Sequence, residues 1–452
     1  MYRFRFDSTN NTNRYEELIK VFLRPEEYEI CRDGQSDGLT GVYEFTGDQD
    51  RICRELYRDL TLLTGKSPKW GILTGIRPVK LAGEIRDEGY ELNEVRRVLE
   101  DRYLLDESKS SLAAEILDYQ RELAGKPAND SISLYVGIPF CPTRCLYCSF
   151  TSNQVSHEEI TDYLEALKKE IKYCGEMTRR QGRRIESLYI GGGTPTSLSA
   201  GELDELLELL DESFDLSGLR EYTVEAGRPD TISEDKLRVM KDRCVGRISI
   251  NPQTTKESTL ELIGRRHTID DFYRACDLVR KVGIETVNTD LIAGLPGEDA
   301  EDFTRSVRDI LATGAENITL HTLAVKRASA LKEMDENFSY RNEDIREKML
   351  TGAHEALRDE GYRPYYLYRQ KHTTGNTENI GFCRDDRLSL YNVRIMEEAQ
   401  SILALGAGGI SKVYYPEENR LERVANVSNY RIYIDRIDEM LERKENGFFI
   451  WR

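Results

Sequence analysis

The chain has 452 residues, of which 39% are hydrophobic, enough for one large domain and one smaller one. A net charge of −17 argues against a nucleic-acid partner, because phosphate contacts need concentrated lysine and arginine. It does not exclude an anionic small molecule, since a pocket can be locally basic in an acidic protein. No apolar run is long enough to span a membrane, and the N-terminus lacks the apolar core of a signal peptide. Nine cysteines without a regular framework favour a reducing compartment, so we expect a cytoplasmic protein.

The first part of the chain, residues 1–128, is predicted to form a separate α+β domain of unknown role. A short alternating strand opens it, several helical stretches follow, and a polar, turn-rich linker ends it, at 2–6, 15–22, 51–63, 92–123 and 124–130 respectively. Arg77 and Lys80 carry the charge to bind a substrate carboxylate. A solvated or helix-capping basic pair is the more frequent role of such residues.

From residue 131 onward, apolar runs alternate with amphipathic stretches. Strands are expected at 132–138, 186–190, 221–226, 246–250, 284–292 and 317–323. Helices are expected between them at 157–180, 199–213, 233–243, 256–282 and 299–314. This alternation predicts an α/β fold with a partial (β/α)6 barrel of the TIM type over 131–330. A mostly helical extension over 331–452 is expected to close the substrate pocket.

Three cysteines, Cys141, Cys145 and Cys148, follow the first barrel strand within eight residues. An iron–sulfur cube normally has four thiolate ligands. Three on one loop leave one iron open to a small chelating molecule. Two other interpretations are weighed: the spacing also suits one face of a helix in a core, and a zinc site is a further alternative. The nearest fourth zinc ligand, His157, lies outside the usual finger spacings.

The Cys-x3-Cys-x2-Cys pattern, with Tyr147 before the last cysteine, resembles the signature of radical S-adenosylmethionine enzymes. The preceding segment 135–140, Tyr-Val-Gly-Ile-Pro-Phe, is similar to the oxygen-independent coproporphyrinogen oxidase group, and most of all to its HemZ-type branch, called coproporphyrinogen dehydrogenase. The resemblance covers about residues 131 to 440. It implies a [4Fe–4S] cluster on the three cysteines, with S-adenosylmethionine bound at the open iron.

The same resemblance implies cofactor contacts at the ends of successive strands. The glycine-rich segment after the second strand would receive the methionine amino group, and polar residues after later strands would bind the amino group, ribose or carboxylate. The implied contacts are Tyr135, Tyr147, Gly192, Gly193, Thr194, Glu225, Gln253, Arg265, Asp290, Ala324 and Ile410. Arg266, next to Arg265, is the alternative for the carboxylate contact. Tyr135 is also a candidate catalytic residue.

His321, after the sixth strand, is the best-placed histidine for proton transfer, and a hydrogen-bonded core histidine is about as frequent. The tract from Tyr362 to Gly375 interleaves tyrosines with Arg363, Arg369, Lys371 and His372. Flat aromatic rings among cations suit a tetrapyrrole with carboxylates, although a surface hairpin is an equal alternative.

The activity that the resemblance implies is oxidative decarboxylation of coproporphyrinogen III propionates to vinyl groups, giving protoporphyrinogen IX. It implies a low-potential electron donor such as flavodoxin or ferredoxin. Two departures affect the substrate: Ser149 and Phe150 stand where the dedicated oxidases continue towards a fourth cysteine, and Gly137 replaces a histidine. A haem chaperone and a radical enzyme that modifies or opens haem are therefore alternatives.

Overall fold

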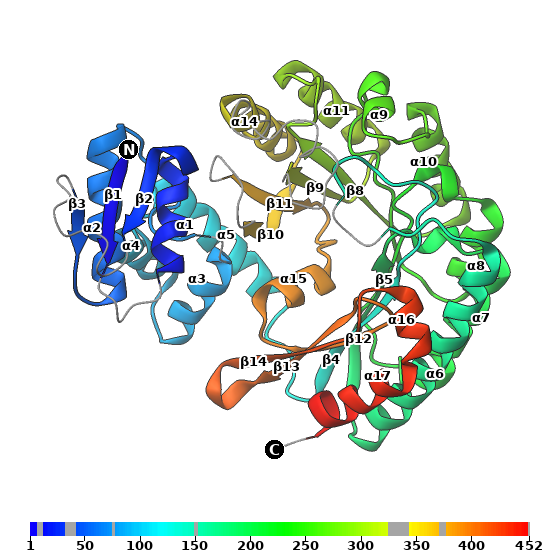
Figure 1. Cartoon of the computed structure of the whole chain (residues 1–452). Helices are drawn as coiled ribbons and strands as arrows, with labels where there is room; N and C mark the ends of the chain where they lie inside the picture. Colours follow the sequence, from blue (N-terminus) through cyan, green and yellow to red (C-terminus); the bar gives the residue numbers. More distant parts are fainter. Residues whose placement is uncertain are drawn as a thin grey trace.

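Six parallel strands form the centre of the molecule (Figure 1). The structure, a computed structural model, describes residues 1–6, 12–31, 42–74, 77–148, 152–323, 343–369 and 377–450. The strands are β4 (Ser131–Ile138), β5 (Arg184–Gly192), β6 (Glu221–Glu225), β7 (Arg247–Ser249), β8 (Thr286–Ala293) and β9 (Asn317–Thr322). Each pairs in parallel with the next along the chain, and most of their residues are buried on both faces. The six predicted strands are confirmed, each to within about two residues at either end.

The C-terminal extension adds strands to both edges of this sheet. The order is β10-β11-β9-β8-β7-β6-β5-β4-β12-β13-β14, in which β12 is parallel to β4 and the outermost pairs are antiparallel. The added strands are β10 (Arg363–Arg369), β11 (Glu378–Cys383), β12 (Ser401–Leu405), β13 (Ile410–Tyr415) and β14 (Arg420–Ala425). In the described residues β10 and β14 do not pair with each other, so the barrel is partial, as predicted. The extension also contains helices α14 (Glu343–Asp359), α15 (Leu390–Glu397), α16 (Tyr430–Asp435) and α17 (Ile437–Lys444).

Helices cover the outer side of the curved sheet (Figure 1). They are α6 (His157–Arg180), α7 (Ala200–Ser213), α8 (Glu234–Asp242), α9 (Glu257–Leu262), α10 (Ile269–Val282) and α11 (Ala300–Thr313). The stretch 256–282, predicted as one helical unit, is broken between α9 and α10. Gly264 has a φ of +77°, and Thr268 starts α10 by accepting a hydrogen bond from the backbone N–H of Asp271. Because the helix is broken here, the short loop between α9 and α10 contacts the cysteine loop.

The N-terminal part contains a small parallel sheet with its own core. Its elements are β1 (Tyr2–Phe6), α1 (Asn13–Phe22), β2 (Tyr28–Cys31), β3 (Val42–Phe45) and α2 (Gln49–Thr64). The core of this unit runs from Phe4 to Ile72. By contrast, helices α3 (Pro78–Asp87), α4 (Leu92–Tyr103) and α5 (Glu107–Leu123) contribute to the same hydrophobic core as the barrel. The domain boundaries 1–128, 131–330 and 331–452 stay predictions. In the structure, residues 78–123 pack mainly against the barrel rather than against the small N-terminal sheet.

Two features complete the open side of the barrel. Helix α15 lies there, between the N-terminal part and the strands (Figure 1). The indole of Trp70 donates a hydrogen bond of 2.9 Å to Glu378 at the start of β11, which ties the N-terminal part to the sheet.

Across the described ranges, no helix is both long enough and apolar enough to cross a membrane.

Candidate active site

A cavity of about 330 Å³ lies at the carboxyl ends of the parallel strands. In a barrel of this kind, these strand ends are where catalytic residues gather. Its walls contain most of the predicted site residues: Cys141, Cys145, Tyr147, Cys148, Gly192, Gly193, Thr194, Glu225, Gln253, Arg265, Asp290 and His321. The structure therefore brings together residues that lie up to 180 positions apart in the chain.

The cysteine loop connects β4 to α6 and forms one wall of the cavity. Its residues form turns rather than a helix, so the helical-face interpretation of the spacing is wrong. Backbone hydrogen bonds fix the loop at both ends: Cys141 N–H donates to Asn153 at 3.0 Å, and Leu146 N–H donates to Ile263 at 2.9 Å. All three cysteines are free thiols.

These thiols fit an iron–sulfur cluster better than a core stripe. Cys141 and Cys148 are only partly buried and face the cavity, whereas Cys145 is buried. Burial raises the pKa of the Cys141 thiol to about 11, so its thiolate needs a positive partner such as iron. Among the described residues, no three Cys, His, Asp or Glu side chains lie close enough to hold a single metal ion.

The glycine-rich segment after β5 lies directly against the cysteine loop. A Cβ atom built on Gly193 would be 2.5 Å from the carbonyl oxygen of Phe140 and 3.0 Å from the sulfur of Cys141. Thr194 N–H donates to the same Phe140 carbonyl at 2.8 Å, and its hydroxyl is 3.4 Å from Cys141 Sγ. Gly192 has a φ of +110°. A glycine is therefore required here for the backbone to approach the cluster position.

Glu225, the last residue of β6, presents a carboxylate to the cavity. It accepts a hydrogen bond from the hydroxyl of Tyr189 on β5. The pKa of Glu225 is raised to about 7, mainly by burial; the Tyr189 hydrogen bond opposes this rise, and the neighbouring Asp290 adds to it. A carboxylate balanced in this way is well suited to bind a cation brought by a ligand.

Two amide side chains after β7 hold polar atoms without partners. Asn251 Oδ1 and Gln253 Oε1 are buried and make no hydrogen bond within the described part of the chain. Gln253 has a φ of +72°, an unfavourable value for a residue with a side chain, and backbone bonds to Asp290 and Ile292 hold it there. Unpaired buried polar groups are rare in proteins, and here they face the cavity. They are available to a bound molecule.

Arg265, rather than Arg266, reaches the cavity. Arg265 is 7% exposed and donates hydrogen bonds to the backbone carbonyls of Asn251 and Gly227, while its Nε has no partner among the described residues. Arg266 is exposed and does not line this cavity. Of the two neighbouring arginines, Arg265 is therefore the one placed to contact a ligand in this cavity, and its role as the carboxylate contact stays a prediction.

His321 on β9 lies in a short hydrogen-bonded row. Its Nδ1 is 3.0 Å from the hydroxyl of Tyr368, and its Nε2 is 3.4 Å from Oδ2 of Asp290. With the ring proton on Nε2, the imidazole donates to Asp290 and accepts from Tyr368. All three side chains line the cavity, so His321 is both hydrogen-bonded and accessible to a ligand.

Other predicted residues lie elsewhere. Tyr135 is stacked below the cavity on Tyr189. Ile410 is 48% exposed at the start of β13 and is not part of the cavity wall. Ala324 lies outside the described residues. Arg77 and Lys80 form ion pairs with Glu398 and do not line this cavity.

The aromatic tract divides between the core and the cavity. Tyr362 and Tyr365 are buried in the interior, Arg363 lies over the ring of Tyr119, and Arg369 donates to the Leu73 carbonyl. Among the described residues of this tract, Tyr368 is the one that lines the cavity. Lys371 and His372 lie outside the described residues.

Sequence reasoning missed Arg228, Asn251 and the specific role of Tyr368. Arg228 is 3% exposed, pairs with Asp230 at 3.0 Å and donates to the hydroxyl of Thr143 in the cysteine loop at 2.5 Å. The pattern Arg-Pro-Asp, which begins three residues after Glu225, is the one signal that points to a fixed arginine here. Nothing in the pattern indicates that it reaches the cysteine loop.

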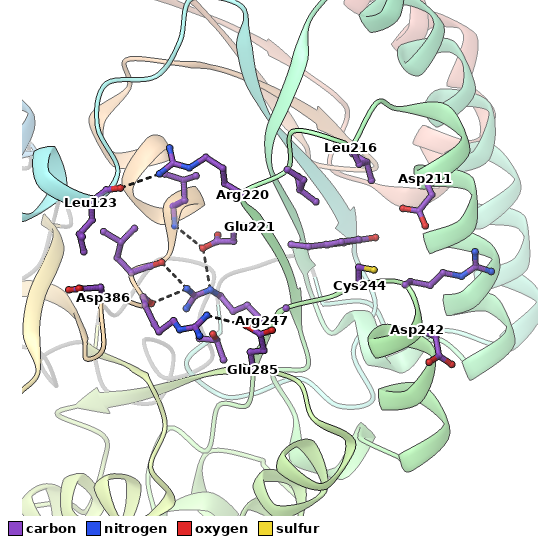
Figure 2. Close-up of a pocket in the computed structure, with 18 residues that line it drawn as sticks. Leu123, Asp211, Leu216, Arg220, Glu221, Asp242, Cys244, Arg247, Glu285 and Asp386 are labelled. Carbon is purple, nitrogen blue, oxygen red and sulfur yellow. Dashed lines mark hydrogen bonds and ion pairs between the residues drawn. The ribbon is translucent and has the colours of Figure 1, made fainter.

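A larger cavity of about 770 Å³ lies at the opposite, amino-terminal ends of β6, β7 and β8 (Figure 2). It contains none of the predicted site residues. Arg247 at its centre pairs with Glu221 at 3.2 Å and donates to the backbone carbonyls of residues 387 and 388. Arg247 and Glu221 thereby join strands β7 and β6 to the C-terminal extension.

Comparisons with known proteins agree with the geometry of the cavity at the carboxyl ends of the strands. A family model described as the Radical SAM superfamily matches residues 135–310. The oxygen-independent coproporphyrinogen-III oxidase-like protein HemZ of Bacillus subtilis is 39% identical over 388 residues, which cover 84% of this chain and 77% of HemZ. The chain belongs to the HemZ-type branch of the radical SAM superfamily. Its cofactors are therefore a [4Fe–4S] cluster and S-adenosylmethionine, which sets aside the zinc alternative.

The chain is also similar to a haem chaperone and to a solved oxidase structure. The haem chaperone HemW of Bacillus subtilis is 34% identical over 195 residues, covering 43% of this chain and 51% of HemW. The solved structure of the radical SAM coproporphyrinogen III oxidase HemN of Escherichia coli has a TM-score of 0.56 at 21% identity, covering 72% of this chain and 73% of that chain. This second match shows that the fold is shared.

Proposed function

We propose that this radical SAM protein catalyses the oxygen-independent oxidative decarboxylation of coproporphyrinogen III, giving protoporphyrinogen IX. A radical derived from S-adenosylmethionine takes one hydrogen atom from a propionate side chain; CO2 then leaves and one electron passes to an external one-electron acceptor, which gives a vinyl group. Two such conversions complete the reaction. The observation that carries the proposal is the convergence, in one cavity, of three cysteines with unpaired buried polar atoms, in a chain 39% identical to HemZ.

The residues around the cavity have distinct proposed roles. When bound, the cluster and S-adenosylmethionine supply a one-electron cleavage that generates a hydrogen-abstracting radical. Cys141, Cys145 and Cys148 hold the cluster, and Glu225, Gln253 and Arg265 on the facing walls bind the polar ends of S-adenosylmethionine. The remaining proposed cofactor contacts are Tyr135, Tyr147, Gly192, Gly193, Thr194 and Asp290, with Ala324 and Ile410 as predictions from the sequence alone.

Apolar side chains and one histidine would complete the site. Ile292 and Leu323 pack with Ile263 and Leu295 beside the cysteine loop, which excludes water from that wall. His321, between Asp290 and Tyr368, is placed to hold a proton next to a bound tetrapyrrole. We also propose that a carrier such as flavodoxin or ferredoxin reduces the cluster, in the reducing compartment predicted from the nine free cysteines.

Haem transfer is the second candidate function, because the haem chaperone HemW is 34% identical over part of the chain. The replacement of a histidine by Gly137 has a structural counterpart. Its carbonyl accepts a hydrogen bond of 2.6 Å from Tyr163, and a Cβ built on Gly137 would be 3.4 Å from the Leu405 carbonyl and the Tyr135 ring. These are ordinary van der Waals distances, so β12 and the loop after it contact this position without a clash at Cβ.

One anaerobic incubation separates these functions. Cluster-loaded protein is reduced with dithionite, or with flavodoxin, and mixed with S-adenosylmethionine and coproporphyrinogen III, and products are separated by chromatography. The proposal expects vinyl product in proportion to the S-adenosylmethionine consumed, and none with Cys145→Ala. A chaperone would bind and pass on haem without making vinyl product, and an enzyme of haem breakdown would consume haem instead. Either result would contradict the decarboxylase proposal.

A further inference from the structure

Three tyrosines form a stacked group next to Glu225 of the cavity wall; Tyr189 and Tyr391 are buried, and Tyr135 is partly buried. They come from different parts of the chain: Tyr135 on β4, Tyr189 on β5 and Tyr391 on α15. The rings of Tyr189 and Tyr391 are 4.5 Å apart between centroids with an interplanar angle of 20°. Tyr135 completes the group, 6.3 Å from Tyr189 and 6.2 Å from Tyr391. These contacts hold the Tyr189 ring in one orientation.

The orientation of Tyr189 directs its hydroxyl at the carboxylate of Glu225. Of the three tyrosines, Tyr189 is the one for which a hydrogen bond to that carboxylate is found in the described residues. Gly191 lies between the two side chains. A Cβ atom built on Gly191 would be 2.8 Å from the Tyr189 ring and 2.9 Å from Oε2 of Glu225. A glycine at 191 therefore lets the phenol and the carboxylate meet.

Contacts at the start of β6, the strand that ends at Glu225, fix the position of Tyr391 in the stack. Glu221, the first residue of β6, accepts hydrogen bonds from the backbone N–H groups of Leu390 and Tyr391 at 2.7 and 3.1 Å, at the start of α15. Arg247 pairs with Glu221 at 3.2 Å, as Figure 2 shows. A carboxylate at a helix N-terminus is a favourable cap. Strand β6 thus anchors α15 at its beginning and carries Glu225 at its end.

We propose that Tyr189, supported by the ring of Tyr391, is a positioning residue that holds the Glu225 carboxylate ionised and aimed at S-adenosylmethionine. This inference rests on the proposed role of Glu225 as a cofactor contact and adds how that contact is prepared. Neither Tyr189 nor Tyr391 needs to touch the cofactor. The C-terminal extension thereby contributes to cofactor binding through α15.

The charges around Glu225 make this role visible in the pH dependence of binding. Tyr189 on β5, Asp290 on β8, His321 on β9 and the backbone of Gly192 all influence it, and burial places its pKa at about 7. The Tyr189 hydrogen bond favours the ionised form. Removing that bond raises the pKa, so a smaller fraction of Glu225 is ionised at neutral pH and recovers as the pH rises.

The test is the affinity of cluster-loaded Tyr189→Phe for S-adenosylmethionine, measured without reductant by anaerobic equilibrium dialysis from pH 6 to 9. We expect the pH midpoint of binding to rise by about one pH unit, so that binding at pH 7 weakens about fivefold and approaches the parent value near pH 9. The matched control is Tyr391→Phe, which keeps the ring. No hydrogen bond of its hydroxyl to Glu225 is found in the described residues, so its midpoint should equal that of the parent.

Further variants make each outcome decisive. Gly191→Ala separates the same two side chains without altering either of them, and should reproduce the raised midpoint if Tyr189→Phe folds poorly. Equal midpoints for the parent, Tyr189→Phe and Gly191→Ala would overturn the inference. Glu225→Gln should abolish the pH dependence between 6 and 9. If Glu225→Gln binds like the parent at every pH, the assignment of Glu225 as a cofactor contact fails, and this inference fails with it.

Discussion

The two ends of the barrel hold cavities of opposite character. The cavity at the amino-terminal ends of the strands (Figure 2) is the larger, at about 770 Å³. Each of its four arginines is nevertheless paired with a carboxylate. These pairs are Arg220–Glu186, Arg243–Asp204, Arg247–Glu221 and Arg387–Glu285. The cavity at the carboxyl ends measures about 330 Å³ and contains the cysteines.

The difference lies in which polar atoms have partners. At the smaller cavity, Asn251 Oδ1, Gln253 Oε1 and Arg265 Nε are buried without a partner among the described residues, and Glu225 has a raised pKa. At the larger cavity, two buried polar atoms lack a hydrogen bond among the described residues, the Tyr222 hydroxyl and Arg247 Nε. Of these, Arg247 Nε lies within ion-pairing distance of Glu221. Cavity size therefore does not identify the site. Polar groups left unpaired at a structural cost identify it better.

The largest effect is expected from the cysteine wall. Cys145→Ala should abolish cluster assembly and S-adenosylmethionine cleavage, because a cube held by two thiolates loses iron. Cys244→Ala is the matched control, since Cys244 is a free, exposed cysteine that lines the larger cavity. Iron and sulfide analysis with a visible spectrum checks both variants. A normal cluster in Cys145→Ala would contradict the site assignment.

Arg247→Ala should cause the second largest effect, and it should be on stability. Arg247 and Glu221 are 7% and 6% exposed, so removing one partner leaves a buried charge and costs about 3–5 kcal/mol of unfolding free energy. Arg387→Ala at the same cavity breaks an exposed pair and should cost at most about 1 kcal/mol. Denaturant unfolding measures both variants. Equal stability losses would remove the distinction drawn between the two pairs.

Gln253→Gly should separate function from stability at the smaller cavity. Glycine tolerates the φ of +72° without strain, so the variant should be as stable as the parent or more stable by up to about 1 kcal/mol. Loss of the amide should weaken S-adenosylmethionine binding about tenfold. Thermal unfolding and anaerobic dialysis are the two measurements. A destabilised variant with unchanged affinity would show that Gln253 is structural.

The smallest effect is expected from Thr143→Val, which removes the hydroxyl that accepts from Arg228 at 2.5 Å. The cluster should still assemble, because the cysteines are unchanged. A loop less firmly held by about 1 kcal/mol should release iron to a chelator about fivefold faster. An unchanged release rate would mean that the backbone hydrogen bonds alone hold the loop.

The sequence predicts the barrel well because parallel strands produce apolar runs that are separated by amphipathic helices. The family resemblance implies site contacts at Glu225, Gln253 and Asp290, and the structure brings all three to one cavity because the ends of neighbouring parallel strands meet at one edge. The break between α9 and α10 was harder to predict, because both halves have the same helical period. Its cause is local, a glycine at 264 and a cap at Thr268.

Contacts between distant segments could not be predicted. Tyr368 lies 47 positions from His321, and Tyr391 lies 202 positions from Tyr189, and neither pair leaves a local pattern. Arg228 is a similar case, since its partner in the cysteine loop is 85 positions away. Such pairings depend on strand order and on the path of the C-terminal extension, which single-sequence patterns do not contain.

The most direct test of the account is the release of 5′-deoxyadenosine from S-adenosylmethionine by the reduced, cluster-loaded protein under anaerobic conditions. The account predicts release of 5′-deoxyadenosine by the parent chain, and none by the Cys141→Ala, Cys145→Ala or Cys148→Ala variants. A fully loaded, reduced parent that binds S-adenosylmethionine but releases no 5′-deoxyadenosine, with or without a tetrapyrrole present, would contradict it.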